Sequence, residues 1–249
     1  MPRFFVNPDQ IDNEYIKITG DDAHHISRSL RMAVGDSISL CNMQGTDFEC
    51  VLDSFTDTVV TAKILSSHPV DTEPCFEAHL FQALPKGDKL DYIIQKAVEC
   101  GISGITTFNS ERCIAKEKFN EENKLKRRQR ISLEASKQSG RGMVPTVNAT
   151  VSFDKMLELA SDYDIMLFCY EKSTTLPLKT AINSYFEKNG KKDGLRIAIV
   201  IGSEGGFSEK EATKADECGM QLVGLGKRIL RTETASSFVL GCLVYEFEL

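Results

Sequence analysis

The chain has 249 residues, of which 41% are hydrophobic and 27% charged, and its net charge is −6. This is the composition of a globular protein with room for one large or two modest domains, and the acidic balance argues against a protein that coats nucleic acid nonspecifically. The longest apolar runs, such as residues 197–201, are too short to span a bilayer, and the first ten residues contain no signal-peptide core. We therefore expect a cytoplasmic protein without a membrane partner.

The eight cysteines are scattered along the chain, and none forms a C-x-x-C pair. In a cytosolic protein, cysteines with this distribution are expected to be reduced and mostly buried. The only histidine pair, His24 and His25, points in two directions on a helix and has no evident third ligand, so we expect no metal site.

The first part of the chain predicts a small β-rich module. Residues 3–65 contain short alternating stretches (YIKI, SISLC, FECVLDSF and VVTAKIL) separated by turn-forming Gly and Asp residues, which is typical of a β-barrel or meander. One helix-like segment, residues 23–31, interrupts them. The polar segment 66–74 contains two prolines and predicts a domain boundary, with domains over residues 1–70 and 74–249.

After this boundary, strand-like and helix-like segments alternate. Strands are expected at residues 77–84, 102–109, 164–170, 195–202 and 221–226. Helices are expected at residues 88–101, 120–138, 152–161, 176–190, 208–218 and from 232 onward, with Ser208 and Glu211 forming a capping box. Alternation of helices with nearly continuous apolar strands predicts an α/β domain with a parallel sheet and helices on both faces.

Two glycine-containing loops stand out in this domain. IGSEGGFSEKE (201–211) and GKRILRTETASS (226–237) each follow a strand-like stretch and precede a helix. Ligands of open α/β sheets bind beyond the carboxyl ends of the strands, and glycine lets backbone N–H groups approach a ligand closely. The two loops therefore indicate a nucleotide-like ligand, unless the glycines only form tight strand-to-helix turns.

The familiar nucleotide-binding patterns are absent from these loops. A Walker loop would need Ser or Thr after Gly226-Lys227, where the chain has Arg228, and glycine at position 221, where it has Gln. The dinucleotide fingerprint G-x-G-x-x-G is also missing around residues 202–206.

The charge is unevenly distributed along the chain. Residues 112–141 contain ten basic and four acidic residues, a net charge of +6 within an acidic protein. This stretch is either a solvated helix face or a focused basic surface for an anionic partner.

Six motifs in order resemble those of the SPOUT methyltransferases, and more narrowly those of the bacterial 16S ribosomal RNA uridine-N3 methyltransferase family. The two glycine loops are joined by HHISRSLR (24–31), QALPKGDKLDYIIQKAVECG (82–101), SERCIAK (110–116) and EASKQSGRGMVP (134–145). The resemblance covers nearly the whole chain. It departs from the family pattern at Ser203, where the family usually has proline, which removes some rigidity from the loop.

The resemblance implies a PUA-like RNA-binding β-barrel over residues 1–70 and a SPOUT α/β methyltransferase domain with a deep trefoil knot over residues 74–249. It implies S-adenosylmethionine as the cofactor, a homodimer with an active site completed across the interface, and small-subunit ribosomal RNA, within the assembled subunit, as the partner. A noncatalytic RNA-binding or ribosome assembly factor, and a SPOUT methyltransferase acting on transfer RNA, are the alternatives.

Carried over to this sequence, the resemblance implies a set of cofactor-binding residues around the two loops. They are Leu84, Phe168, Tyr170, Ile201, Gly202, Gly205, Gly206, Leu225, Gly226, Arg228, Ile229, Leu230, Thr234 and Ala235. Ordinary core packing is an equally good interpretation of Leu84, Phe168 and Tyr170.

Methyl transfer to N3 of uridine requires loss of the N3 proton, so a base or donors that stabilise the uridine anion must assist. Arg231 and Arg141 suit the second role, and Glu204 and Glu233 are candidate bases. Glu233 is equally explained as an acid in the first turn of a helix.

The expected RNA-binding residues are basic or polar. They are His24, His25, Arg28, Arg31, Arg112, Lys116, Gln138 and Arg141. Arg28 and Arg31 are three positions apart and are expected to share one helix face toward phosphate.

Overall fold

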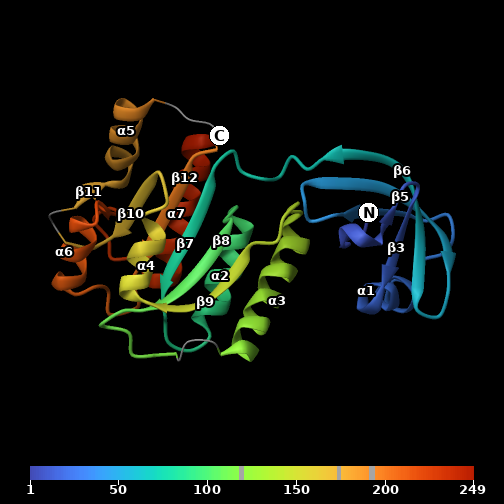
Figure 1. Cartoon of the computed structure of the whole chain (residues 1–249), viewed down its shortest axis with the longest axis horizontal. Coiled ribbons are helices and arrows are strands. Elements are labelled where there is room, and N and C mark those ends of the chain that lie inside the picture. Colours follow the sequence, from blue (N-terminus) through green and yellow to red (C-terminus); the bar gives the residue numbers. More distant parts are fainter. Residues whose placement is uncertain (118–120, 173–174, 191–193) are drawn as a thin grey trace. The chain divides into compact units, whose positions relative to one another are not determined.

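The computed structural model describes residues 1–117, 121–172, 175–190 and 194–249 (Figure 1). The chain divides into two compact units: Met1–Glu73 with Ser136–Val144, and Pro74–Ala135 with Pro145–Leu249. The division near residue 73 lies within the expected boundary segment, but the sequence did not indicate that residues 136–144 belong to the first unit. Within the described ranges, no helix is long and apolar enough to cross a membrane.

The first unit contains a six-stranded sheet in the order β1-β4-β5-β6-β3-β2. Its strands are β1 (Arg3–Phe5), β2 (Ile11–Asp12), β3 (Tyr15–Thr19), β4 (Ser37–Cys41), β5 (Thr46–Phe55) and β6 (Val59–Pro69). The β1–β4 pair is parallel and the other pairs are antiparallel. The expected β-rich module is therefore confirmed, although β6 extends into the segment that we assigned to the boundary.

The helices of the first unit are short: η1 (Pro8–Gln10), α1 (Gly20–His24) and the π-helical η2 (His25–Ser29). Ile26 of η2 is fully buried with Ile16 and Ile38, so this helical segment closes the core of the unit. The helix expected over residues 23–31 thus begins at Gly20 and ends at Ser29, and Arg31 follows it with a left-handed backbone (φ 52°).

Segment 136–144 is tied to the first unit by a buried ion pair. Arg141 is only 4% exposed, its Nη2 lies 2.5 Å from Oε2 of Glu73, and its carbonyl oxygen accepts a hydrogen bond from Arg3 Nη1 at 2.7 Å. The other Glu73 oxygen accepts from the N–H of Gly142 at 2.7 Å. Because a buried guanidinium is costly without a partner, these contacts explain why the segment packs with residues far away in the sequence.

The described residues of the second unit form a seven-stranded sheet in the order β11-β13-β10-β12-β7-β8-β9. Its strands are β7 (Glu77–Ala83), β8 (Gly104–Asn109), β9 (Thr146–Ser152), β10 (Ile165–Cys169), β11 (Leu176–Pro177), β12 (Arg196–Ile201) and β13 (Gln221–Gly224). Each pairing in this sheet is parallel, as expected. The sequence did not indicate β9 or the two-residue β11.

Six helices of the second unit follow the expected ranges closely. They are α2 (Lys89–Glu99), α3 (Glu122–Ser139, which ends in the first unit), α4 (Phe153–Ala160), α5 (Leu178–Asn189), α6 (Glu209–Glu217) and α7 (Thr232–Phe247). The capping box of α6 is confirmed, since Ser208 Oγ accepts from the Glu211 N–H and a Glu211 carboxylate oxygen accepts from the Ser208 N–H.

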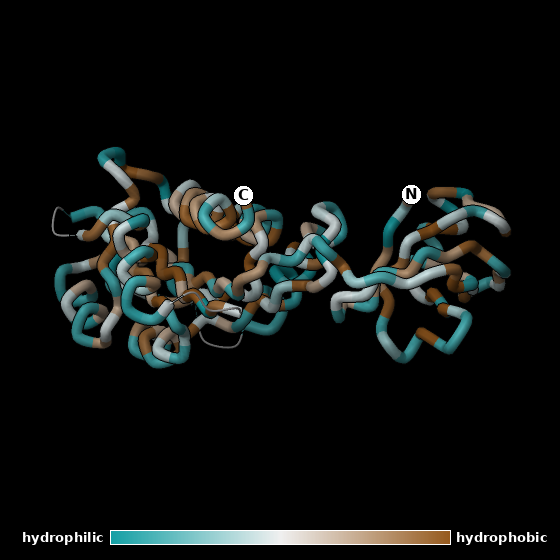
Figure 2. Tube along the Cα trace, turned by 90° about the horizontal axis from the view of Figure 1, so that it is seen from above, coloured by the Kyte–Doolittle hydropathy of each residue, from teal (hydrophilic) through white to brown (hydrophobic). Residues whose placement is uncertain are grey.

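Both faces of this sheet are covered. Residues 197–201 of β12 are all buried, and successive side chains of a strand point to opposite faces, so helices must pack on both sides (Figure 1). Figure 2 shows the hydrophobic segments running through the interior of the second unit and the hydrophilic ones at its outside. With both faces buried, only the strand ends can present polar groups to a ligand.

Candidate functional site

The expected cofactor residues gather at one edge of the sheet. Four strands that are neighbours in the sheet, β13, β10, β12 and β7, end at this edge. Leu84 follows β7, Tyr170 follows β10, Gly202 follows β12, and Leu225 follows β13. Because the strands are parallel, the chain segments that leave them meet at the same place.

The first glycine loop, residues 202–206, is a turn packed closely against its own surroundings. The N–H of Gly206 donates to the Ser203 carbonyl at 2.9 Å, and Gly206 has a φ of 64°. A Cβ atom added to Gly202 would lie 3.2 Å from Gly206 Cα, and one added to Gly205 would lie 3.0 Å from Arg112 Cβ. Close approach of the chain to itself therefore accounts for these glycines.

The second loop, residues 225–231, is exposed over most of its length. The Ile229 side chain is 89% exposed, and Gly226 adopts a φ of 97°. Arg231 is the N-cap residue of α7, and its carbonyl oxygen accepts from the N–H groups of Thr234 and Ala235. This loop leaves the side chains of Arg228 and Arg231 exposed to solvent.

Five expected cofactor residues belong to the hydrophobic core: Leu84, Phe168, Tyr170, Ile201 and Ala235. Phe168 is fully buried, and its ring centroid lies 4.1 Å from that of Phe207; Leu84 and Tyr170 are also buried. The core-packing interpretation thus describes the side chains of Leu84, Phe168 and Tyr170 better than an open pocket wall does, and only their backbone groups lie at the strand ends.

Lys89, which the sequence analysis did not single out, links both candidate bases. Its Nζ lies 2.7 Å from Glu204 Oε1 and 3.8 Å from Glu233 Oε2, and the backbone N–H of Lys86 also donates to Glu204 at 3.1 Å. Burial opposes ionisation of Glu204, but the hydrogen bond from Lys89 and those from backbone N–H groups outweigh it and lower the pKa of Glu204. A carboxylate with a lowered pKa is a weak proton acceptor, which argues against Glu204 as the base.

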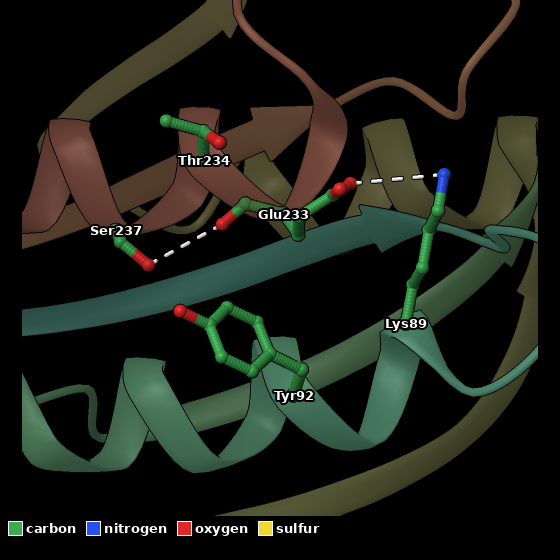
Figure 3. A pocket seen from close by; sticks show the side chains of 5 residues that line it. All are labelled: Lys89, Tyr92, Glu233, Thr234 and Ser237. Atoms are coloured by element: carbon green, nitrogen blue, oxygen red, sulfur yellow. Dashed lines mark hydrogen bonds and ion pairs between the residues drawn. The ribbon is translucent and has the colours of Figure 1, made fainter.

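A pocket of about 450 Å³ lies between α2 and α7 (Figure 3). It is lined by Lys89, Tyr92, Glu233, Thr234 and Ser237. Glu233 Oε2 is buried and has no hydrogen-bond partner among the described residues, although it is near Lys89. The pocket thus contains two expected site residues, Glu233 and Thr234, which lie in the first turn of α7, but its lining includes no residue of 202–206 or 225–231.

Arg112 contacts the first glycine loop directly. Its Nη1 donates to the Gly205 carbonyl at 3.2 Å, and the neighbouring Glu111 N–H donates to the buried Glu211 at 2.7 Å. We expected Arg112 to bind RNA, and its contact with the loop backbone is one that the sequence did not indicate. Lys116 is exposed.

Many basic side chains of the stretch 112–141 form ion pairs, three of them with carboxylates outside the stretch. One of its ten basic residues, Lys118, lies outside the described residues. Six others pair with carboxylates: Lys124, Lys126, Arg127, Arg128, Lys137 and Arg141.

Arg141, expected both in catalysis and in RNA binding, is buried against Glu73 in the first unit. Its guanidinium is therefore not presented to a ligand in this structure, and the expected roles are corrected to a structural one.

The other expected RNA-binding residues of the first unit are exposed: His24, His25, Arg28, Arg31 and Gln138. Arg28 lies in η2, but Arg31 lies beyond it with a left-handed backbone. The expectation that these two arginines share a helix face is therefore wrong.

We predict that Lys89→Met raises the pKa of Glu204, because the substitution removes the hydrogen bond that stabilises the ionised carboxylate. Carboxyl NMR titration would measure this shift. Lys96→Met is the matched control, since Lys96 lies on the same helix and pairs with Glu99 at 2.7 Å. An unchanged Glu204 titration in Lys89→Met would contradict the contact.

Comparison with known proteins finds relatives over both units of the chain. Models of an RNA methyltransferase domain and of an RNA methyltransferase PUA domain match residues 71–244 and 18–65. The ribosomal RNA small subunit methyltransferase E of Bacillus subtilis is 34% identical, with 100% of this chain and 98% of that protein covered.

Two solved structures with a similar fold were crystallised with a ligand. The ribosomal RNA small subunit methyltransferase E of Neisseria gonorrhoeae, bound to S-adenosyl methionine, superimposes with a TM-score of 0.83 at 28% identity, covering 99% of this chain and 98% of that one. A methyltransferase from Legionella pneumophila in complex with S-adenosyl methionine gives a TM-score of 0.82 at 25% identity, with 98% and 97% covered. With its PUA domain and its parallel α/β domain, the chain belongs to the ribosomal RNA small subunit methyltransferase E family of RNA methyltransferases.

Proposed function

We propose that this protein transfers a methyl group from S-adenosylmethionine to N3 of a uridine in small-subunit ribosomal RNA. The observation that carries the proposal is the meeting of the two loops at the carboxyl edge of the parallel sheet, where ligands of such sheets bind. The family relationship and the S-adenosyl methionine bound to the Neisseria gonorrhoeae protein support this cofactor.

The residues of the second loop suit the cofactor. Residues 226–229 are exposed, so their backbone groups can bind the adenine edge and ribose hydroxyls, while Leu225 and Leu230 offer apolar contacts. Bound S-adenosylmethionine supplies a methyl group activated by its sulfonium. The protein then has to position the uridine and assist loss of the N3 proton.

Glu233 and Arg231 are the residues that we assign to this proton transfer. Glu233 Oε2 lies 3.8 Å from Lys89 Nζ but has no hydrogen-bond partner among the described residues, whereas Glu204 accepts hydrogen bonds from Lys89 and from the Lys86 N–H. Glu233 is thus better suited to accept a proton. The exposed Arg231 is suited to stabilise the negative charge that develops on the uridine oxygens.

We further propose that RNA is bound by exposed residues of both units, within the assembled small subunit. The first unit contributes His24, His25, Arg28 and Gln138, and the second contributes Arg112 and Lys116. Recognition of a structured subunit by shape and local contacts is compatible with the net charge of −6.

The proposed trefoil knot lies in the segment from β12 to α7. Its support is the strand order, in which the late strand β13 is inserted between β10 and β11. In an experimentally determined structure, shortening the backbone path between its two fixed ends should leave a trefoil knot. A path that reduces to a straight line would refute the proposed knot.

Methyl transfer is the direct test of the proposed function. We expect that labelled S-adenosylmethionine, incubated with small subunits from cells lacking this enzyme, gives labelled 3-methyluridine after RNA digestion. Label in another nucleoside would overturn the specificity, and label in transfer RNA alone would favour a transfer RNA methyltransferase. No cofactor binding and no label would favour a noncatalytic assembly factor.

We predict that Arg231→Ala lowers the turnover number at least roughly a hundredfold, since removal of one donor to a developing negative charge commonly costs this much. Arg196→Ala is the matched control. Arg196 begins β12 at the opposite edge of the sheet, where it donates to the Asp162 carbonyl, so its loss should leave turnover near the wild-type value. Wild-type turnover in Arg231→Ala would exclude the role that we assign.

We also propose a homodimer that forms through α7 and α2. Positions 234, 238, 241 and 245 form an exposed stripe on α7, in which Tyr245 is 72% exposed, and Tyr92 of α2 is exposed too. Sedimentation should give a dimer for the wild type and a monomer for Tyr245→Glu combined with Phe238→Glu. Lys155→Glu, on the exposed side of α4, is the control; a monomeric wild type would refute the proposal.

A further inference from the structure

A buried glutamine lies directly beneath the two loops. Gln82 is the penultimate residue of β7 and is 0% exposed, although its neighbours Phe81 and Ala83 are apolar. Its Nε2 group has two N–H donors and lies 2.9 Å from Thr232 Oγ1, 2.9 Å from the Ala83 carbonyl and 3.3 Å from the Gly202 carbonyl, so the longer contact to Gly202 shares an N–H with one of the other two. The two carbonyl acceptors fix the orientation of the amide, since only its nitrogen can donate to them.

The Thr232 hydroxyl completes this arrangement. Thr232 Oγ1 accepts from Gln82 and donates to the Gly202 carbonyl at 2.6 Å. Gly202 begins the first glycine loop, and Thr232, the first residue of α7, directly follows the second. One strand and both loops are therefore joined through three side-chain hydrogen bonds, which we call the Gln82–Thr232–Gly202 clamp.

The clamp determines which way the first loop faces. The Gly202 carbonyl oxygen accepts a short hydrogen bond from Thr232 Oγ1 at 2.6 Å and a longer, shared one from Gln82 Nε2 at 3.3 Å, so it is engaged inside the protein. This carbonyl consequently points toward the buried side chains of Gln82 and Thr232.

Gln82 leaves a buried acceptor without a hydrogen bond to the described residues, which destabilises the folded protein. Gln82 Oε1 is buried and has no hydrogen-bond partner among the described residues. An apolar side chain of similar volume would avoid this unpaired acceptor. A polar residue kept at a buried position despite such a cost is expected where function needs it.

We infer that Gln82 and Thr232 are positioning residues of the cofactor site, which hold the two loops in the relative placement that binds S-adenosylmethionine. The inference rests on the proposed function and deepens it. Neither side chain has to touch the cofactor, because both act through the backbone of Gly202 and through the start of α7. Loss of the clamp lets the loops move independently, so cofactor binding weakens while RNA binding is retained.

Three variants test the inference. Gln82→Met removes the donors at similar volume, Thr232→Val removes the hydroxyl without changing the shape, and Thr232→Ser keeps the hydroxyl. Thr106→Val is the matched control, because Thr106 is a buried threonine of β8 whose hydroxyl also takes part in two side-chain hydrogen bonds, with His79 and Asn148.

The first measurement is amide hydrogen exchange of residues 203–206 and 225–231 in protein without cofactor. The second is the calorimetric Kd for S-adenosylmethionine, together with the KM for the RNA substrate and the melting temperature. We expect exchange in both loops to accelerate and the Kd to rise roughly tenfold in Gln82→Met and Thr232→Val, with the RNA KM unchanged and Thr232→Ser close to wild type.

Wild-type Kd and exchange in both variants would overturn the inference. An equal rise in Kd in Thr106→Val, at an equal loss of melting temperature, would overturn it as well, since the effect would then be one of general stability. A wild-type protein that fails to bind S-adenosylmethionine would refute the proposed function instead, and the exchange data would still decide whether the clamp holds the loops.

Discussion

The constraint on which this structure depends is a parallel sheet that is buried on both faces. The strands β12 and β7 have few exposed side chains, so helices occupy the space on either side and polar chemistry is confined to the strand ends. The chain uses the ends of neighbouring strands to bring together segments that are distant in sequence, such as Gln82 and Thr232. The position of the site is therefore a consequence of how the core is covered.

The two loops at the carboxyl ends of the strands, residues 202–206 and 225–231, differ in how closely the rest of the protein packs against them. The first is packed so closely against Arg112 and Phe207 that added Cβ atoms would come within 3.0 to 3.2 Å of them, whereas the second is exposed and includes a solvent-facing isoleucine. A preformed first loop reduces the ordering cost of binding, and an exposed second loop leaves backbone groups available to the ligand. The clamp connects them, so that order in one loop is transmitted to the other.

Periodicity predicted most of the fold because burial follows it directly. The helix at residues 88–101 buries Leu90, Ile93, Ile94, Ala97 and Val98 as expected. Strand β9 was missed because its sequence, TVNATVS, is polar at several positions and only partly buried. The fate of an expected site residue was less predictable: Arg141 is buried against Glu73, 68 positions away, and no local pattern indicates that they pair. The sequence also does not show the contacts of Lys89 with Glu204 and Glu233, or those of Gln82 with Thr232 and Gly202, because these contacts depend on how the fold brings distant segments together.

The ion pairs change how an acidic protein can bind RNA. Six basic residues of the stretch 112–141 are paired with carboxylates, so each competes with an internal partner before it can contact phosphate. Within the described part of this stretch, the exposed basic residues outside these pairs are Arg112, Lys116 and Arg130. Two weak contacts on one chain gain affinity when both engage the same substrate, because the second contact becomes intramolecular. A structured RNA that offers both contacts at once is then favoured over RNA that offers only one, and selectivity arises without a strongly basic surface.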